Sequence, residues 1–566
     1  MSQSSNDILT LKFIATSDIH GAVFQFDFVE DVLTTSSLSQ IYTYVNEQRQ
    51  NPHQEVILLD NGDVLQGQPL VYYENIEYER DEQKTHLIAQ VMNYMKYDAA
   101  CIGNHDIATG HKVYDRLRKE FKFPWLAANI IDKRTGEPYF SPYTIIKRRG
   151  IKIAVMGLIT PAIPKWLPEH LWENMCFEDM IQTAEKWMKI IKEKEKPDIV
   201  VGLFHAGVDY TYNRQNENTY KNENATVLVA RQIPGFDFIF AGHDHQENFF
   251  IVENVDKEKV LILNPQSLAN FVSVVNVKMV YDKKIGKWKK LDITGLNLEM
   301  NFCETHTEFK RKFGHYISII RNKLSEPVGY FTRTISSREA LFSDSAFVDL
   351  IHSIQMDITG ADISFAAPLS FDTKVKRGPV FIRDMFKLYK FENLLYTIWL
   401  KGYEIKKYLE FSYGLWFNTM ENENDFLLNF KVNYKGELIL AEKYYNFSSA
   451  AGIIYEVDIR KPIGSRINIL RMANGEPFDP NKTYRIAINS YRAIGGGGHI
   501  IEGVGIPQKE IPKRILSKSE KDIRTLITEW IRKKQIVSPK ALAHWRVVPG
   551  GWWYKGRYKS YKVIFG

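Results

Sequence analysis

The sequence predicts an α/β protein with two domains, and three observations support this. The chain has 566 residues, more than one compact core accommodates, so we expect each half to bury its own core. Short apolar runs alternate with helix-type segments through the first half, the order expected when helices cover a mixed sheet. Hydrophobic residues make up 44% and charged residues 25% of the chain, which indicates a globular rather than a disordered protein.

The first half alternates strands and helices. A strand over residues 11–16 precedes a helix over 38–49, and a strand over 56–60 precedes a helix over 87–96, which leads into an apolar segment at 99–103. Further strands are predicted over residues 143–147, 152–158, 199–204 and 236–240. The first two of these flank a basic turn with a glycine and predict a hairpin. The last two are continuous apolar runs, typical of strands buried on both faces.

A charged amphipathic helix over residues 308–324 separates the two halves. Its apolar residues recur at helical spacing, and Pro327 follows its end. We therefore predict a first domain over residues 1–305, a linker helix region over 306–327 and a second domain over 328–566.

The second half mixes helices and strands without an internal repeat. Helices are predicted over residues 345–357 and 402–413, and strands over 394–400 and 484–488. The Trp-Trp-Tyr segment at 552–554 is aromatic and lies in a basic stretch. We expect it to form a packed last strand rather than a binding patch.

Charge and cysteine content exclude several classes of protein. Lys and Arg total 74 against 67 Asp and Glu, a net charge of +7, and no basic run is long enough for a nucleic-acid-binding arm. This mild excess suits an anionic small-molecule substrate, or serves solubility alone. Cys101, Cys176 and Cys303 are scattered and odd in number, so they predict neither a disulfide framework nor a cysteine metal cluster. Any metal would have to be held by His, Asp, Asn or Glu.

The hydropathy pattern predicts a soluble protein. The first residues lack the basic start and apolar stretch of a secretory signal, and no apolar run approaches the roughly 18 residues needed to cross a bilayer. We expect a monomer with no membrane and no nucleic-acid polymer as partner. The trimmed form of an exported protein would look the same.

Polar residues of the kinds that bind metals directly follow five of the predicted strands. They are Asp18 and His20, then Asp63, then Asn104 with His105 and Asp106, then His205, and finally His243 with His245. In open α/β sheets, sites form beyond the carboxyl ends of the strands, so these loops should converge. A single histidine at a strand end is most often structural. Five such loops in order favour one shared site.

The residue types suit a centre of two divalent ions. Two ions about 3.5–4 Å apart need a bridging carboxylate and a mixture of nitrogen and oxygen ligands. Asp63 is the natural bridge in this set. A mixed site of His, Asp and Asn accepts Mn, Zn, Fe or Co ions.

The order and spacing of these residues closely resemble the calcineurin-like metallophosphoesterases. The shared motifs are Asp-x-His at 18–20, Gly-Asp at 62–63, Gly-Asn-His at 103–105, His at 205 and Gly-His-x-His at 242–245. The resemblance implies a four-layer domain of mixed sheets covered by helices. It also implies that one ion is bound by Asp18, His20, Asp63 and His245, and the other by Asp63, Asn104, His205 and His243.

The resemblance implies a reaction as well. The two cations would activate a bridging water, and the resulting hydroxide would attack phosphorus in line with the leaving oxygen. His105, next to a ligand but not itself one, would face the substrate phosphate, stabilise its charge and protonate the leaving alkoxide. Many members of the family place an aspartate three residues after this histidine to orient it. Here that position is Ala108, so Asp106 or another acid would have to orient His105.

With its large second domain, the chain resembles the family of 5′-nucleotidases and 2′,3′-cyclic-nucleotide phosphodiesterases over nearly its whole length. The resemblance implies a second α/β domain that binds the nucleoside between two aromatic rings. These correspond to Phe447, in an Asn-Phe-Ser-Ser-Ala-Ala-Gly segment, and Tyr491, before a run of four glycines. Stacking on a ring face is worth about 1–3 kcal/mol per base.

Two further segments indicate the branch of this family. Strict 5′-nucleotidases carry a Gly-Gly-Ile-Arg type segment that binds substrate, and the corresponding stretch here, residues 366–372, contains no arginine. This stretch, the segment ending at Asn393, and Tyr491 followed by Arg492 resemble the 2′,3′-cyclic 2′-phosphodiesterase branch, which also cleaves 3′-nucleotides. Asn393 and Arg492 are therefore further candidates for substrate binding. The resembled family is often periplasmic or extracellular.

Three other functions are weighed against this hypothesis. A 5′-nucleotidase or nucleotide-sugar hydrolase is the nearest alternative, and the missing arginine counts against it. A nucleotide-binding or adhesion module with a vestigial site is the alternative of a different class. The complete set of ligands from Asp18 to His245 counts against that. Hydrolysis of another ester, such as a phospholipid, would leave the second domain unexplained.

Overall fold

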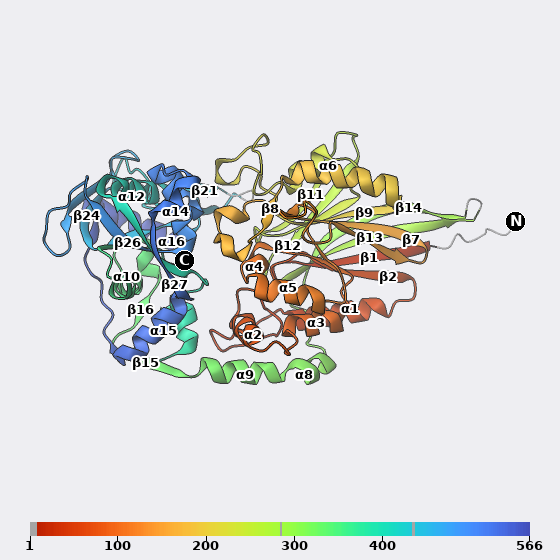
Figure 1. Ribbon diagram of the computed structural model, residues 1–566, viewed down its shortest axis with the longest axis horizontal. Coiled ribbons are helices and arrows are strands. Elements are labelled where there is room, and N and C mark those ends of the chain that lie inside the picture. The colour runs from red at the N-terminus through yellow and green to blue at the C-terminus, as the bar shows by residue number, and fades with distance from the viewer. Residues whose placement is uncertain (1–7, 284–285, 433–435) are drawn as a thin grey trace. The chain divides into compact units, whose positions relative to one another are not determined.

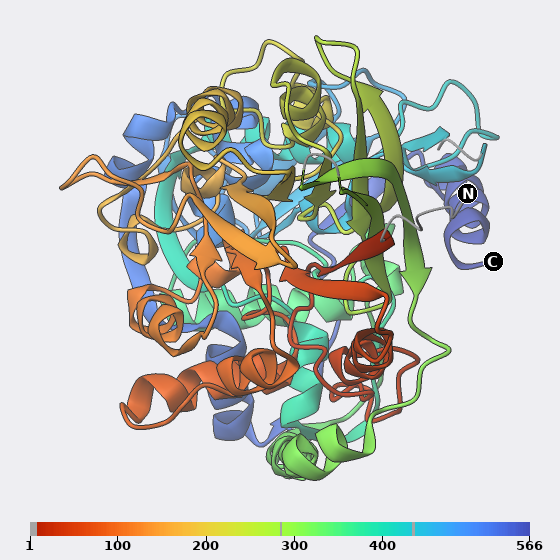
Figure 2. The same cartoon turned by 90° about the vertical axis from the view of Figure 1, so that its right-hand side faces the viewer.

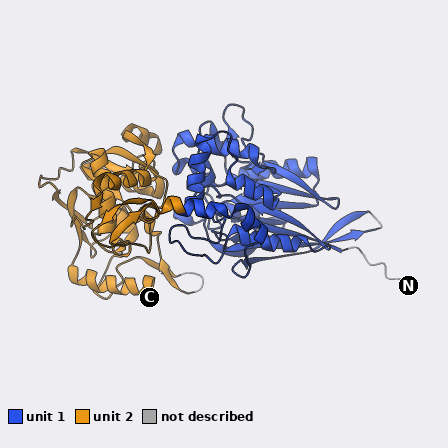
Figure 3. Cartoon of the chain, turned by 90° about the horizontal axis from the view of Figure 1, so that it is seen from below, with its two compact units in different colours: residues 1–321 blue, residues 322–566 orange. Residues whose placement is uncertain are grey.

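The chain divides into two compact units, Met1–Arg321 and Asn322–Gly566 (Figures 1 and 3). The structure is a computed structural model that describes residues 8–283, 286–432 and 436–566. The division lies within the predicted linker, where α8 (Thr307–Phe313) and α9 (His315–Leu324) follow each other with Gly314 between them. In the described ranges, no helix is long and apolar enough to cross a bilayer.

Two six-stranded sheets form the centre of the first unit. The first sheet has the order β14 (Lys287–Glu299), β13 (Phe271–Asp282), β1 (Ile8–Thr16), β2 (Gln54–Asp60), β3 (Ala99–Cys101) and β4 (Trp125–Leu126). The second has the order β11 (Glu247–Glu253), β12 (Lys259–Pro265), β10 (Phe238–Ala241), β9 (Ile199–His205), β7 (Ile151–Ile159) and β6 (Tyr143–Arg148). Their central strands run parallel and their outer hairpin strands antiparallel, so both sheets are mixed.

The two sheets pack face to face, and helices cover their outer faces. Alternate residues such as Phe13 and Ile57 of the first sheet share one core with Val155, Leu203 and Phe238 of the second. The flanking helices are α1 (Leu38–Arg49), α3 (Leu87–Met95), α5 (His111–Glu120), α6 (Met180–Ile190) and α7 (Thr226–Gln232). Figures 1 and 2 show α6 on one side of the strands and α1, α3 and α5 on the other. The predicted four-layer arrangement is confirmed.

The second unit is built on a five-stranded mixed sheet. Its order is β23 (Ser449–Ala451), β17 (Ile363–Ala366), β26 (Thr483–Asn489), β20 (Leu394–Lys401) and β27 (Ile515–Asp522). Two helices that the sequence predicts, α10 (Ala346–Thr359) and α12 (Gly402–Trp416), pack against this sheet. The unit is an α/β domain, as predicted.

The segment expected to be a last strand is instead a helix, α16 (Gly550–Phe565). Its buried residues are the small Gly556 and Ser560, four positions apart on one helical face. The Ser560 hydroxyl accepts the backbone N–H groups of Leu427 and Leu428 at 3.0 and 3.2 Å. The aromatic composition suggested a strand, but the small residues at helical spacing allow a helix to pack closely on this backbone.

Phe447 belongs to the core of the second unit, which corrects its expected role in base binding. Its side chain is 2% exposed, and its ring stacks on Trp416 with centroids 5.6 Å apart and planes at 15°. The Tyr413 and Phe417 rings also pack against the Phe447 ring, with centroid distances of 5.2 and 5.8 Å. A ring enclosed in this way has no free face for a nucleobase.

Phe447→Ala should therefore act on stability. Removing a fully packed phenylalanine typically lowers the free energy of unfolding by about 3–5 kcal/mol, since a cavity remains. We expect this loss in a denaturant titration of the full chain followed by tryptophan fluorescence. The exposed Tyr558 supplies the control, because Tyr558→Ala should change the value by less than about 0.5 kcal/mol. An unchanged unfolding midpoint for Phe447→Ala would contradict the core assignment.

Candidate metal centre

The seven predicted metal ligands follow five strand ends that the two sheets bring to one place. In the first sheet Thr16 pairs with Asp60, and Asp60 with Ala100, so β1, β2 and β3 end at the same level. In the second sheet Ala241 pairs with Phe204, so β10 and β9 also end together. Contacts join the two sets of loops. The His243 backbone N–H donates to Asp18 Oδ2 at 3.0 Å.

Five of the seven residues have a left-handed backbone. The φ angles of Asp18, His20, Asp63, His243 and His245 are 51°, 49°, 60°, 76° and 57°. A non-glycine residue in this region costs about 1–3 kcal/mol, and such residues cluster at functional sites. The strain is held by backbone hydrogen bonds, such as those from the Asp18 N–H to Gly62 O at 2.9 Å and from the His20 N–H to Asp63 O at 2.8 Å.

Two glycines allow the loops to approach each other this closely. A Cβ atom on Gly103 would lie 2.1 Å from Asp63 Oδ1, and one on Gly242 would lie 2.2 Å from Ser17 Oγ. Both distances are far below van der Waals contact, so no larger residue fits. This explains the glycines before Asn104 and His243 in the sequence motifs.

The first predicted ligand group is compact. Donor atoms of Asp18, His20, Asp63 and His245 all lie within 4.8 Å of one another. His20 Nε2 is 2.9 Å from His245 Nε2, and His245 Nε2 is 3.4 Å from Asp18 Oδ1. Asp18 and Asp63 are fully buried, whereas the His245 side chain is 43% exposed, so the group opens on that side.

The second predicted group is equally close. Asn104 Oδ1 lies 3.1 Å from His205 Nε2 and 2.8 Å from His243 Nδ1. His205 Nε2 is also 3.3 Å from Asp63 Oδ2. Asp63 is thus a member of both groups, the position that a bridging carboxylate requires.

The donor set fits divalent cations. The buried Asp63 Oδ2 atom has no hydrogen-bond partner among the described residues, although a buried carboxylate oxygen normally has one. The far nitrogens of two ligands are fixed, because His20 Nδ1–H donates to Gln66 O and His205 Nδ1–H to Asn61 O, both at 2.6 Å. Their Nε2 atoms therefore point into the centre, as in metal sites whose outer contacts orient the imidazoles.

Burial and mutual charge set the ionisation of this cluster. Burial alone would raise the pKa of Asp63, but His205 and His105 lower it well below its usual value. Burial opposes the charge of His205 too, yet Asp63 and Asp18 raise its pKa to about 10. For His20 burial dominates and lowers the pKa to about 3. The centre therefore retains buried anionic carboxylates, which a cation stabilises.

Asp106 does not orient His105, which corrects the sequence-based expectation. Its carboxylate accepts the backbone N–H groups of Asp63, Val64, Leu65 and Gly103 at 2.8–3.0 Å. Asp106 follows His105 on the short helix α4 (Asn104–Ile107), where consecutive side chains point about 100° apart. Asp106 instead shapes the loop that carries Asp63.

Gln66 takes the orienting position that sequence reasoning missed. Its Oε1 atom forms a short contact with His105 Nδ1, and its backbone carbonyl accepts from His20. The available signal was its place three residues after Asp63 on the same loop. Gln66 fixes the His105 ring with Nε2 as the free nitrogen.

The remaining candidates lie in the second unit. Tyr491 is partly exposed on the short helix α13 (Ser490–Ala493), whereas Arg492 is 3% exposed. The Arg492 guanidinium donates to Tyr445 O at 2.6 Å and Gly496 O at 2.9 Å, so it holds the glycine loop rather than an open site. Asn393 is partly exposed.

Phe391 is an aromatic residue in this neighbourhood that the sequence analysis did not single out. The Leu394 backbone N–H donates to Ser490 Oγ at 3.1 Å, which places the segment around residue 393 beside α13. Phe391 is partly exposed and lies against the Tyr445 ring at 6.1 Å. Its spacing of two residues from Asn393 was the available signal.

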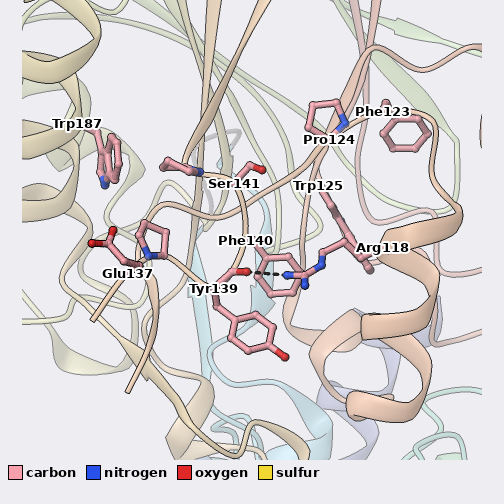
Figure 4. A pocket seen from close by; sticks show the side chains of 11 residues that line it. Arg118, Phe123, Pro124, Trp125, Glu137, Tyr139, Phe140, Ser141 and Trp187 are labelled. Carbon is pink, nitrogen blue, oxygen red and sulfur yellow. Dashed lines mark hydrogen bonds between the residues drawn. The ribbon is translucent and has the colours of Figure 1, made fainter. Parts of the chain in front are cut away.

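A surface hollow elsewhere in the first unit is separate from the candidate centre. It has a volume of about 610 Å³ and is lined by aromatic residues and prolines, with Arg118 donating to Tyr139 O at 2.6 Å (Figure 4). None of its lining residues is a predicted ligand. The chemistry of the candidate centre therefore rests on the strand-end loops.

Comparison with known proteins supports these domains. The calcineurin-like phosphoesterase family model matches residues 11–247, and the 5′-nucleotidase C-terminal domain model matches residues 323–502. The trifunctional nucleotide phosphoesterase protein YfkN of Bacillus subtilis is 27% identical over 95% of this chain, which spans 39% of that protein's length. A 2′,3′-cyclic-nucleotide 2′-phosphodiesterase/3′-nucleotidase of Haemophilus influenzae is 26% identical, covering 97% of this chain and 89% of the relative.

A solved structure shows the same fold. The 5′-nucleotidase precursor from Thermus thermophilus matches with a TM-score of 0.65 and 18% identity. The match covers 96% of this chain and 100% of that one. At this identity the likeness shows the fold alone.

Asp106→Asn tests the role of Asp106 in shaping the Asp63 loop, and His105→Asn serves as the comparison because His105 is expected to contact substrate and not metal. An amide at position 106 puts an N–H₂ group against backbone donors, so we expect the Asp63 loop to distort and bound metal to fall. His105→Asn removes no predicted ligand and should leave the metal content unchanged. Elemental analysis after dialysis measures both variants against the wild type. Equal metal contents for all three proteins would contradict the assigned role of Asp106.

Proposed function

We propose that this chain, which combines a calcineurin-like phosphoesterase domain with a 5′-nucleotidase C-terminal domain, hydrolyses 2′,3′-cyclic nucleotides and 3′-nucleotides with two divalent ions. The observation that carries the proposal is Asp63, a buried carboxylate shared by two groups of metal-type donors. The Haemophilus influenzae relative, which this chain matches over most of both lengths, is named for this activity, and that supports the substrate class.

We assign each group of donors one ion. Asp18, His20, Asp63 and His245 would hold the first, and Asp63, Asn104, His205 and His243 the second. Mn, Zn, Fe and Co ions all suit this mixture of nitrogen and oxygen donors. When bound, such ions activate water and neutralise charge on a phosphoryl group.

The side chains beside the donors then act on the substrate. His105 is partly exposed beside the first group, with its ring 5.3 Å from that of His20. Since Gln66 holds Nδ1, the free Nε2 is the atom that would meet the phosphate. Burial lowers the pKa of His105, whereas an anionic phosphate beside the ring would raise it. The protonated ring would then donate to the leaving oxygen.

We infer that the second unit supplies the specificity for nucleotides. Tyr491 and Phe391 are partly exposed aromatic rings on neighbouring segments, and Phe391 replaces the buried Phe447 in this role. Asn393 lies on the same segment as Phe391 and can bond polar groups of a nucleoside. The buried Arg492 would support this surface by holding the glycine loop. The substrate is a free nucleotide, and we infer a monomer.

A 5′-nucleotidase remains the second candidate. The match of residues 323–502 to the 5′-nucleotidase C-terminal domain model favours it. The stretch that starts at the last residue of β17, residues 366–372, counts against it because it offers no arginine for a substrate phosphate.

A panel of substrates tests the proposed function. Turnover of 2′,3′-cAMP, 3′-AMP, 5′-AMP, a nucleotide sugar and bis-p-nitrophenyl phosphate would be measured with Mn, Zn, Fe and Co. We expect the first two nucleotides to be preferred, and Asp63→Asn to abolish all turnover because it removes the shared carboxylate. Preference for 5′-AMP would select the second candidate. Full activity of Asp63→Asn would overturn the two-ion assignment.

Tyr491→Ala and Phe391→Ala test the aromatic surface. Each removes a stacking contact worth about 1–3 kcal/mol, so KM for nucleotides should rise about 5- to 150-fold. Turnover of bis-p-nitrophenyl phosphate should change little, because that substrate carries no base. A uniform loss on both kinds of substrate would point to damaged folding instead of lost stacking.

A further inference from the structure

We propose that Glu223 is a positioning residue that holds the His243 imidazole toward the second group of metal donors. No motif in the sequence analysis includes it. The inference rests on the proposed metal-dependent function and adds an acid to its centre. Glu223 lies in the connection between β9 and α7, after the strand that carries His205.

The structure fixes His243 from three directions. Its Nδ1 atom faces the centre, 2.8 Å from Asn104 Oδ1. Its Nε2 atom faces outward, 3.6 Å from Glu223 Oε1. The ring of Trp166 stacks on the imidazole, with centroids 5.3 Å apart and planes at 25°. The contact with Asn104 indicates that Nδ1 is the nitrogen that would bind metal. The Glu223 carboxylate lies on the opposite side of the ring, at Nε2.

The burial of Glu223 requires an explanation. The residue is 5% exposed, and a buried carboxylate is costly unless a positive or donating group faces it. Among the residues that the structure describes, His243 is the basic group within ion-pairing distance of Glu223. The buried acid therefore faces a ring nitrogen of a predicted ligand in the candidate metal centre.

The surrounding loop is built to hold this acid in place. The Glu223 backbone N–H donates to Gln215 Oε1 at 3.0 Å, and Asn213 Nδ2 donates to Glu223 Oε2 at 3.2 Å. Its neighbours are tied as well, because Asn222 Nδ2 donates to Tyr210 O at 2.8 Å and Asn224 Nδ2 to Asp209 O at 3.2 Å. With Oε2 occupied by Asn213, Oε1 is the atom left to face His243.

The arrangement has a defined chemical consequence. At 3.6 Å the attraction is between a charge and the imidazole dipole rather than a hydrogen bond. A carboxylate at this side favours the tautomer with hydrogen on Nε2, which leaves the Nδ1 electron pair for a cation. Carboxylates placed behind ligating histidines act in this way, and their loss typically lowers metal affinity about 10- to 100-fold.

Metal binding by Glu223→Ala and Glu223→Gln tests the proposal, with Glu217→Ala as the matched control. Glu217 is an exposed acid in the same loop and contacts no predicted ligand. Competition with a chromophoric chelator would give the affinities of full-length protein for Zn and Co. Absorption of the Co form would report on the ligand field of the second ion. We expect Glu223→Ala to weaken one of two ions by about 10- to 100-fold and to change the Co spectrum.

The conservative variant separates positioning from folding. Glu223→Gln keeps an oxygen acceptor on a side chain of the same length, so its metal affinity should be higher than that of Glu223→Ala. With the metal removed by a chelator, its stability to unfolding should equal that of the wild type. If Glu223→Ala fails to fold, the Gln variant alone decides. Affinities and Co spectra equal to those of Glu217→Ala would overturn the role of Glu223 and leave the proposed function intact. A wild-type protein that binds no divalent ion would overturn both.

Discussion

The buried carboxylate of Asp63 is the constraint on which the rest of the first unit depends. It lies where loops of two sheets meet, and one of its oxygens has no hydrogen-bond partner among the described residues. An unsatisfied buried anion is unfavourable in a protein without a cation. The ring nitrogens and amide oxygen around it are the groups that a cation prefers. A divalent ion bound among these groups would stabilise the Asp63 carboxylate further.

The scaffold stabilises this arrangement in two ways. Left-handed backbone at five predicted ligands is unfavourable locally, and the packed sheets of the first unit hold it in place. The Asp106 carboxylate accepts hydrogen bonds from four backbone N–H groups and so holds the loop of Asp63 in its shape. The predicted ligands are therefore already arranged for the proposed ions, which would reduce the ordering cost of binding.

The second unit separates structural aromatic residues from accessible ones. Phe447 and Trp416 stabilise its core, and Arg492 secures the glycine loop from within. Tyr491 and Phe391 remain partly exposed on neighbouring segments. Specificity for nucleotides would then come from the exposed rings of Tyr491 and Phe391, while the buried aromatic residues around Phe447 stabilise the domain that carries them. The same residue types serve both purposes, and burial distinguishes them.

The sequence by itself determined the two α/β units and the seven candidate ligands, because ligands that follow strand ends are local in the chain. The period of apolar residues locates a strand, and the residue after it necessarily lies at the edge of the sheet. Only the tertiary structure decided the partners of Asp106, the burial of Phe447 and the place of Glu223, since these depend on contacts between distant segments. The helix α16 shows the same limit. Its aromatic composition alone predicted a strand, but its contact with the backbone at Leu427 favours a helix.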